Sequence, residues 1–283
     1  DILSSADFDV SSIAKRVVAI RSVSPAVDPF LAFAPMSRGW GAVVGAREAV
    51  TVTGYATKET EERFPKCVAL ARDVARELER RRTMDDQWYW LGSDYEVTVS
   101  QWSEAAAPLI VLRAEHLETQ SLLHVRTALT HLVNTRHSQA EVRVNVAGEE
   151  SQAGVKIRMG ASGRTSGAEQ YGSLLPANGS GVGMHITHPL NAGTWLCRRL
   201  ASKLVNEGRG RAVMVQATWL PFDARASLIR VRNEKGQDLS KDVDLAQLDL
   251  AALPPEFVTP NLVTSSLQAP YDASVALPWE QKV

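Results

Sequence analysis

Three stretches of this sequence repeat apolar residues at the three-and-four spacing of a helix, and short alternating β-branched segments lie between them. We expect helices near residues 59–82, 115–137 and 194–206. Thr194 is in position to cap the third helix and Gly208 to end it. The first helix has the clearest apolar stripe: Phe64, Cys67, Val68, Ala71, Val74, Ala75 and Leu78.

The β-branched segments between and after these helices predict short strands. They lie at 49–55, 95–102, 108–112, 141–147, 155–159, 212–220 and 227–232. We therefore predict an α+β fold, with three amphipathic helices packed on short, mostly antiparallel strands. A mixed α/β arrangement stays open, because the first strands and helices alternate along the chain as in a βαβ layer.

Both ends of the chain carry apolar segments broken by prolines, which fix φ and disfavour helix at the preceding residue. We expect these ends to be extended arms that lie on a partner surface. An aromatic cluster between the first helix and the next strand is expected to close a core or an interface. The candidate interface residues are Phe30, Leu31, Phe33, Trp88, Trp90, Phe257, Leu262, Tyr271 and Trp279.

The pattern divides the chain into five parts. Residues 1–48 form the N-terminal arm, 49–159 an α/β core, and 184–253 the second part of the core. Between the two core parts, residues 160–183 form a Gly/Ser-rich loop with seven glycines. Residues 254–283 form the Pro-rich C-terminal arm. A length of 283 residues suits one large domain or two modest ones.

The composition narrows the class of protein. Lys and Arg total 31 against 32 Asp and Glu, so no global charge draws the chain to nucleic acid or an anionic membrane. No apolar run reaches the length of about 18 residues that a membrane span needs. Two cysteines without a CxxC pattern indicate reduced structural thiols. An intracellular (cytoplasmic) or virion location is therefore predicted. The start at Asp1, without Met, is compatible with a processed product or a piece of a longer polypeptide.

No complete catalytic or cofactor motif is present, so we predict no catalytic residue and no cofactor. A GxSxG elbow and a phosphate-binding GxxxxGK[ST] loop are both missing. His185 and His188 are weak candidates for a metal site, because an HxxH pair on a strand points to opposite faces and Pro189 disfavours a helix. We favour a pair of loop histidines without a metal.

These features favour a structural subunit of a large homo- or hetero-oligomeric assembly, such as a viral capsid or shell protein, whose arms contact copies of itself or sister subunits. One alternative is an α/β enzyme or ligand-binding domain that uses the 160–183 loop with His185 and His188. A second is a nucleic-acid-binding module that uses Arg80–Arg82 and Trp88–Trp90, although any such contact is expected to be weak. Arg198 and Arg199 are expected at a solvated helix end.

Overall fold

The computed structural model describes residues 45–46, 48–103, 105–151, 170–172, 175, 178 and 187–253. Outside these residues lie most of the predicted N-terminal arm at 1–48, the predicted C-terminal arm at 254–283 and the predicted strand at 155–159. The chain divides into two compact units. Of the described residues, the first unit contains 45–65 and those from 170 onward, and the second contains 66–151.

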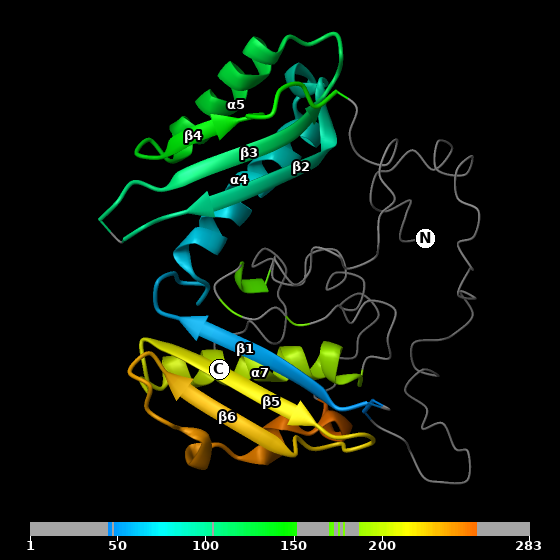
Figure 1. The fold of residues 1–283 in the computed structure, drawn as a ribbon, viewed down its shortest axis with the longest axis vertical. Helices are drawn as coiled ribbons and strands as arrows, with labels where there is room; N and C mark the ends of the chain where they lie inside the picture. Colours follow the sequence, from blue (N-terminus) through cyan, green and yellow to red (C-terminus); the bar gives the residue numbers. More distant parts are fainter. Residues whose placement is uncertain are drawn as a thin grey trace, which may run out of the picture. The chain divides into compact units, whose positions relative to one another are not determined.

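The first unit is a three-stranded antiparallel sheet with one long helix on one face (Figure 1). Its strands are β1 (Val50–Thr57), β5 (Ala212–Trp219) and β6 (Leu228–Asn233), in the order β1-β5-β6. The helix, α7 (Thr194–Asn206), packs against β1 and β5. The predicted strands at 49–55, 212–220 and 227–232 are therefore confirmed to within a few residues.

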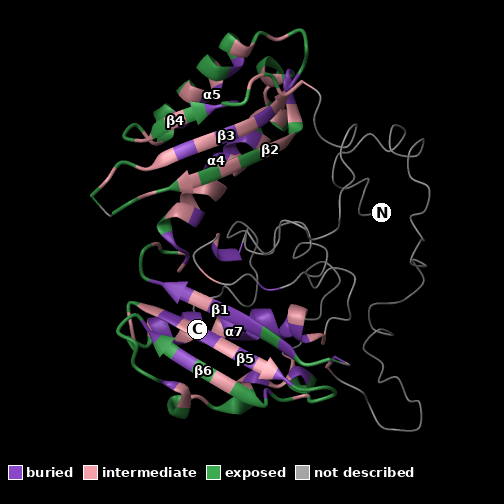
Figure 2. Cartoon of the chain, viewed as in Figure 1, coloured by how far each residue is buried: buried purple, intermediate pink, exposed green. Residues whose placement is uncertain are grey.

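In this unit, burial follows the strand alternation in β5 and β6 (Figure 2). Strand β1 is buried at most of its residues, including Thr53 and Thr57. Every second residue of β5 is buried toward α7, from Val213 to Trp219. Gly54 of β1 lies so close to the helix that an added Cβ would be 2.2 Å from the backbone carbon of Cys197. The helix can pack this closely on β1 only because residue 54 has no side chain.

Helix α7 begins differently from the prediction. A π-helical turn, Pro189–Gly193, leads directly into it, and Gly193 rather than Thr194 is its N-cap. The Thr194 hydroxyl donates back to the Leu190 carbonyl at 2.9 Å, so the predicted cap at Thr194 is wrong. Gly208 follows the last turn with φ of +76°, which confirms the predicted stop.

The second unit is a three-stranded sheet with two helices on one face. Strand β3 is central, antiparallel to β2 on one side and parallel to β4 on the other. Helix α5 connects β3 to β4, as a parallel pair requires. The elements are α4 (Lys66–Met84), the short 3₁₀ turn η1 (Asp86–Trp88), β2 (Leu91–Ser100), β3 (Leu109–His116), α5 (Leu122–Arg136) and β4 (Glu141–Val144).

Helix α4 begins later than the stripe of apolar residues suggests. It starts at Lys66, directly after Pro65, whereas we predicted a start near 59. The hydroxyl of Thr60 accepts from the Phe64 N–H at 3.0 Å and donates to the Phe64 carbonyl at 2.8 Å. These bonds hold residues 60–64 in a turn, which belongs to the first unit.

The predicted α+β class with mostly antiparallel strands is confirmed. The βαβ alternative applies only to β3, α5 and β4, because β1 lies in the other sheet. The leucine-rich segment after β6 forms three short 3₁₀ turns, Ser240–Asp242, Leu245–Leu248 and Leu250–Ala252. Within the described residues, no helix is long and apolar enough to cross a membrane.

Candidate functional site

The outer edge of β1 is joined by side chains from the Gly/Ser-rich stretch. The Asn178 side chain accepts from the Thr53 N–H at 2.7 Å and donates to the Thr53 carbonyl at 2.8 Å. It therefore pairs with β1 much as a neighbouring strand would. The same amide nitrogen lies 3.1 Å from Gln170 Oε1 and 3.3 Å from Thr194 Oγ1. Asn178 thus joins β1 to the start of α7.

Tyr171 makes a second attachment to the same edge. Its hydroxyl accepts from the Tyr55 N–H at 3.1 Å, and its ring is stacked with Phe64, with centroids 6.2 Å apart. Tyr171 is only 1% exposed. The sequence predicted a long loop here, and its described residues are firmly anchored in the core of the first unit.

Arg198 is fully buried, so its expected place at a solvated helix end is wrong. Its guanidinium donates to the carbonyls of Tyr55, Glu62 and Arg63 at 2.5, 2.8 and 3.0 Å. It also lies 3.8 Å from the centroid of the Phe64 ring. These contacts hold the chain that leaves β1 against α7, and the fork of five donors makes arginine suited to this task.

One end of this unit carries a histidine and a carboxylate that face each other. His188 is the N-cap of the π-helical turn, and its Nδ1 accepts from the Leu190 N–H at 3.2 Å. Its Nε2 lies 3.8 Å from Glu48 Oε1. The His188 side chain is 12% exposed and that of Glu48 is 64% exposed. The pair therefore lies where a nearly buried ring meets solvent.

The bonds of His188 define its chemistry. Because Nδ1 accepts a backbone hydrogen bond, the neutral ring carries its proton on Nε2, toward Glu48. Burial lowers the pKa of His188, and the nearby Glu48 carboxylate partly opposes this effect. The lowered pKa favours the neutral ring, whose one N–H points toward Glu48. Glu48 offers a negative charge to a cationic group beside it.

Other segments meet at this end of the unit. Val50, the first residue of β1, is paired with Trp219, the last residue of β5. A Cβ on Gly193 would lie 3.0 Å from the Trp219 ring. The Phe222 N–H donates to the Ala46 carbonyl at 2.9 Å. The start of β1, the turn after β5 and the entry to α7 are therefore close neighbours around the His188–Glu48 pair.

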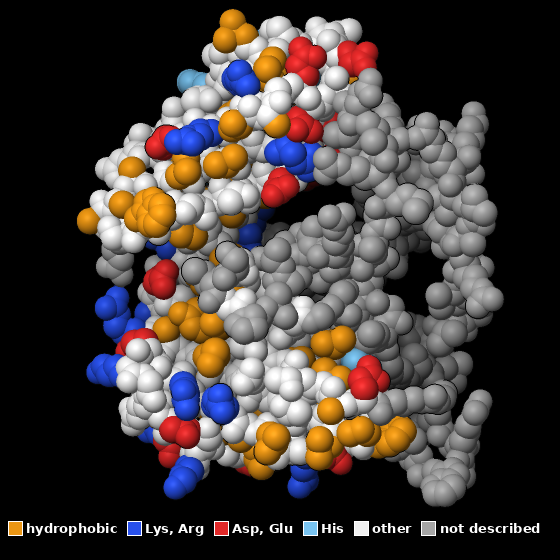
Figure 3. Space-filling model, viewed as in Figure 1, with side chains coloured by type: hydrophobic (Ala, Val, Ile, Leu, Met, Phe, Trp, Pro, Cys, Tyr) orange, Lys and Arg blue, Asp and Glu red, His pale blue; other side chains and the backbone are white. Residues whose placement is uncertain are grey.

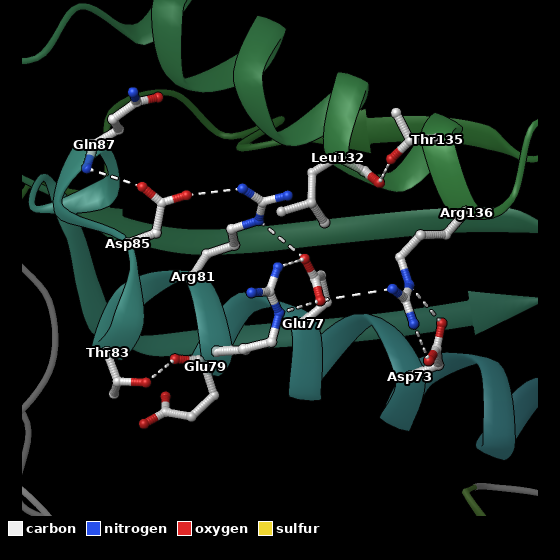
Figure 4. A network of polar contacts seen from close by, with 11 residues as sticks. Asp73, Glu77, Glu79, Arg81, Thr83, Asp85, Gln87, Leu132, Thr135 and Arg136 are labelled. Carbon is white, nitrogen blue, oxygen red and sulfur yellow. Dashed lines mark hydrogen bonds and ion pairs between the residues drawn. The ribbon is translucent and has the colours of Figure 1, made fainter.

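The richest cluster of charges lies in the second unit (Figure 4). Glu77 is 7% exposed and accepts from Arg80 and Arg81. Its pKa is lowered to about 2, mainly by its hydrogen bond to Arg80. Arg136 of α5 binds Asp73 of α4 at 2.8 Å and lies 3.6 Å from Glu77. Each charged group named here has a partner of opposite charge. The network therefore holds α4 against α5 and is not a candidate ligand site.

The predicted nucleic-acid patch belongs to this network. Arg80 and Arg81 bind Glu77, and Arg82 binds Glu79 at 2.6 Å. Trp88 is stacked with Trp90 at 5.2 Å between centroids. These ion pairs neutralise the cations that a phosphate backbone would need, so the described contacts of this cluster do not favour a nucleic-acid module.

The other predicted site residues lie in the core of the second unit, in the candidate site of the first unit, or outside the described residues. Trp90 is 3% exposed and lies in the core of the second unit, with Trp88 half-buried against it. His188 is part of the candidate site, whereas His185 lies outside the described residues. Among the residues that the structure describes, no group of three or more His, Cys, Asp or Glu is placed to hold a metal. Outside the described residues lie Phe30, Leu31, Phe33, Phe257, Leu262, Tyr271 and Trp279.

Sequence reasoning missed most of this site. Glu48 was assigned to the N-terminal arm, and Asn178 to an irregular loop. Arg198 had a usable signal, since it lies four residues after Thr194 and three before Ala201 on the buried stripe of α7. An arginine on an apolar helix stripe is expected to be buried with hydrogen-bonding partners, unless the stripe itself was assigned to the wrong face. Glu48 and Asn178 gave no such signal.

The described residues thus form an α+β protein of two units, with the His188–Glu48 pair at one end of the first. Residues 43–156 match the family model described as S-adenosylmethionine synthetase, central domain. The S-adenosylmethionine synthase of Deinococcus radiodurans is 25% identical over 266 residues. That alignment covers 84% of this chain and 64% of the relative, so the chain spans less than two thirds of its length.

A solved structure is similar as well. An unusual S-adenosylmethionine synthetase from Campylobacter jejuni has a TM-score of 0.66 with 19% sequence identity. The comparison covers 84% of this chain and 69% of that one. At this identity the similarity establishes a shared fold.

These findings overturn the expectation of a capsid or shell protein. The family model, the curated relative and the solved structure are all S-adenosylmethionine synthetases, not structural proteins of a virion. The expectation rested on a missing catalytic motif and on apolar, proline-broken ends. Neither feature distinguishes a shell subunit from an enzyme whose site is assembled from dispersed residues, and the virion location is withdrawn with it.

Proposed function

We propose that this chain is an enzyme of the S-adenosylmethionine synthetase type, or a binding protein for the same ligand. The His188–Glu48 pair carries the proposal. S-adenosylmethionine has a sulfonium cation and an α-amino group, and the exposed Glu48 carboxylate offers the opposite charge. The neutral His188 ring offers an N–H donor beside it. The resemblance of residues 43–156 to the central domain of these enzymes supports the same ligand.

The chemistry of the product defines the reaction to test. A sulfonium forms when the thioether sulfur of methionine attacks the 5′ carbon of an adenosine that carries a good leaving group. The carbon–oxygen bond then breaks, and the leaving group departs with the electron pair. ATP is the natural probe for such a donor, since its phosphates leave as a stable anion. A carboxylate near the sulfur stabilises the positive charge that develops there.

The test uses the full chain with methionine, ATP and Mg²⁺, and detects S-adenosylmethionine by mass spectrometry. Direct binding of S-adenosylmethionine is measured by calorimetry in parallel. We expect Glu48→Gln to weaken this binding about tenfold, the loss of one charge-assisted contact. His188→Gln should weaken it as well. Glu118→Gln and His131→Gln serve as matched controls, because both residues are exposed in the second unit. A chain that neither forms nor binds the compound would refute the proposal.

We also propose that the chain associates with copies of itself inside the cell. The apolar segments at 1–48 and 254–283 remain the predicted contacts. Light scattering on the full chain, with and without residues 254–283, tests this idea. A mass near 30.9 kDa for the full chain would contradict it.

A further inference from the structure

The three strands of the second unit share one end, at which β2 begins and β3 and β4 end (Figure 1). Leu91, the first residue of β2, is paired with His116, the last residue of β3. The Leu117 N–H donates to the Trp90 carbonyl at 3.0 Å, which holds the two chain segments together beyond this pair. Strand β4 ends on the same side because it is parallel to β3.

Both helices of the unit reach this end as well. Helix α4 ends here, because only the short turn η1 leads from it to β2. The His124 ring in the first turn of α5 lies edge-on to the Trp90 ring, with centroids 5.5 Å apart. Arg126 donates to the carbonyls of Val144 and Asn145 at 3.1 and 2.7 Å, so the start of α5 also contacts the end of β4.

Three segments therefore meet at this end: 84–91, 116–124 and 145–150. Each carries large apolar side chains that are between 45% and 78% exposed, and together these side chains form what we name the apolar end: Met84, Tyr89, Leu117, Leu123 and Val146. Large apolar side chains that gather on the surface of one end of a unit are typical of an interaction site.

The charges at the apolar end are acidic. Its three segments contain no lysine or arginine, and they carry exposed carboxylates at Asp86, Glu118 and Glu149. Arg126 lies beside them, but its guanidinium is bound to backbone carbonyls. In Figure 3, several acidic side chains lie at the end of this unit where α5 begins. The surface thus combines apolar contact area with negative charge.

This charge discriminates between the possible occupants. A second copy docked about a two-fold axis would bring the same acidic side chains face to face, and like charges across an interface are unfavourable. Nucleic acids and anionic membranes carry the same sign of charge and would be repelled. We infer that the apolar end binds a basic amphipathic segment of a partner protein, whose apolar side chains are flanked by lysine or arginine. The inference goes beyond the proposed function and does not depend on it.

The test measures peptide binding to the full chain by fluorescence anisotropy. The probe is a synthetic peptide of leucine and lysine whose leucines lie on one helical face. One control peptide has glutamate in place of each lysine, and the other has the same composition in an order without an apolar face. We expect the Kd of the probe to be at least about tenfold lower than that of either control peptide.

Two double variants separate the apolar contribution from that of charge. Tyr89→Ser with Leu123→Ser removes apolar contacts, and Asp86→Lys with Glu118→Lys reverses two charges. Each should raise the Kd of the probe about tenfold, and only the charge variant should lose the weakening of binding by added salt. All four residues are exposed, so the melting temperature should change little.

Leu228→Ser with Glu61→Lys is the matched control, because both residues are exposed in the first unit, and it should bind the probe as the wild type does. A probe that does not bind, or that binds the two double variants as tightly as the wild type, overturns the inference. Binding only after deletion of residues 1–44 would show that the chain's own N-terminal part occupies the surface. A mass by light scattering that halves in the charge variant would identify a second copy, and either result overturns the inference as well.

Discussion

Replacing Asn145 tests how side chains complete the edges of these sheets. Asn145 follows β4, is 1% exposed and has φ of +43°. Its side chain accepts from the Ala114 N–H at 2.8 Å and donates to the Ala114 carbonyl at 3.0 Å. It extends the pairing of β3 beyond the end of β4, as Asn178 does for β1 in the other unit. Asparagine also tolerates the left-handed backbone.

Three variants separate these contributions. Asn145→Gly keeps the backbone but leaves the two buried groups of Ala114 without their partner, and we expect a loss of about 2–4 kcal/mol. Asn145→Ala adds the cost of a side chain in the left-handed region, about 1 kcal/mol more. Asn145→Asp keeps the acceptor for the N–H but sets a carboxylate oxygen against the Ala114 carbonyl. At pH 7 it should be at least as unstable as the alanine variant.

The aspartate variant carries a pH signature. Burial beside a carbonyl should raise the pKa of the introduced carboxyl group in the folded state above its unfolded value of about 3.9. The protonated acid can donate to the Ala114 carbonyl, so the variant should regain stability as pH falls from 7 toward 4. Urea unfolding at both pH values measures this effect, and amide exchange at Ala114 reports the local opening. A variant as stable as the wild type at pH 7, or a difference that does not change with pH, would refute the reasoning.

Three further predictions follow from the described contacts. Arg198→Met should lower the free energy of unfolding by about 3 kcal/mol or more, and Arg198→Lys by less, as measured by denaturant unfolding. The lowered pKa of Glu77 means that its contribution to stability is present above pH 4.5 and is lost as pH falls toward 2, so Glu77→Gln should flatten acid unfolding over that window. Burial raises the pKa of the Cys197 thiol, so a thiol reagent should modify Cys197 in urea but not in the native protein, as peptide mass mapping would show.

The sequence predicted the regular elements of the first unit well because their signals are local. Helix α7 and strands β1, β5 and β6 appear within a few residues of their predicted ranges. Periodic burial fixes such elements, since a change of register would expose their apolar faces. The start of α4 was missed because the apolar stripe continues through Phe64 into a turn that belongs to the other unit. The spacing of apolar residues does not show in which of the two units a side chain is buried.

The candidate site could not be predicted in the same way. Glu48 and His188 are 140 residues apart in sequence, and only the packing of the π-helical turn near the start of β1 brings them together. His188 was noticed for its spacing from His185, a pattern of metal sites. The structure instead gives it a capping bond and a carboxylate neighbour. The presence of a histidine at position 188 was informative, but the sequence did not show that Glu48 is its neighbour.

Two described residues of the Gly/Ser-rich stretch, Tyr171 and Asn178, bind the edge of β1. Asn178 and Tyr171 satisfy backbone N–H groups of β1 that would otherwise need a further strand. Asn178 also lies within 3.3 Å of the Thr194 hydroxyl at the start of α7. A change at Asn178 should therefore disturb both the sheet edge and the start of α7, which follows His188 and its π-helical turn. Unlike Asn145, whose loss should affect stability alone, Asn178 should couple the stability of the first unit to the geometry of the proposed ligand site. Asn178→Asp should consequently lower both the melting temperature and the affinity for S-adenosylmethionine, whereas Asn145→Asp should lower only the first.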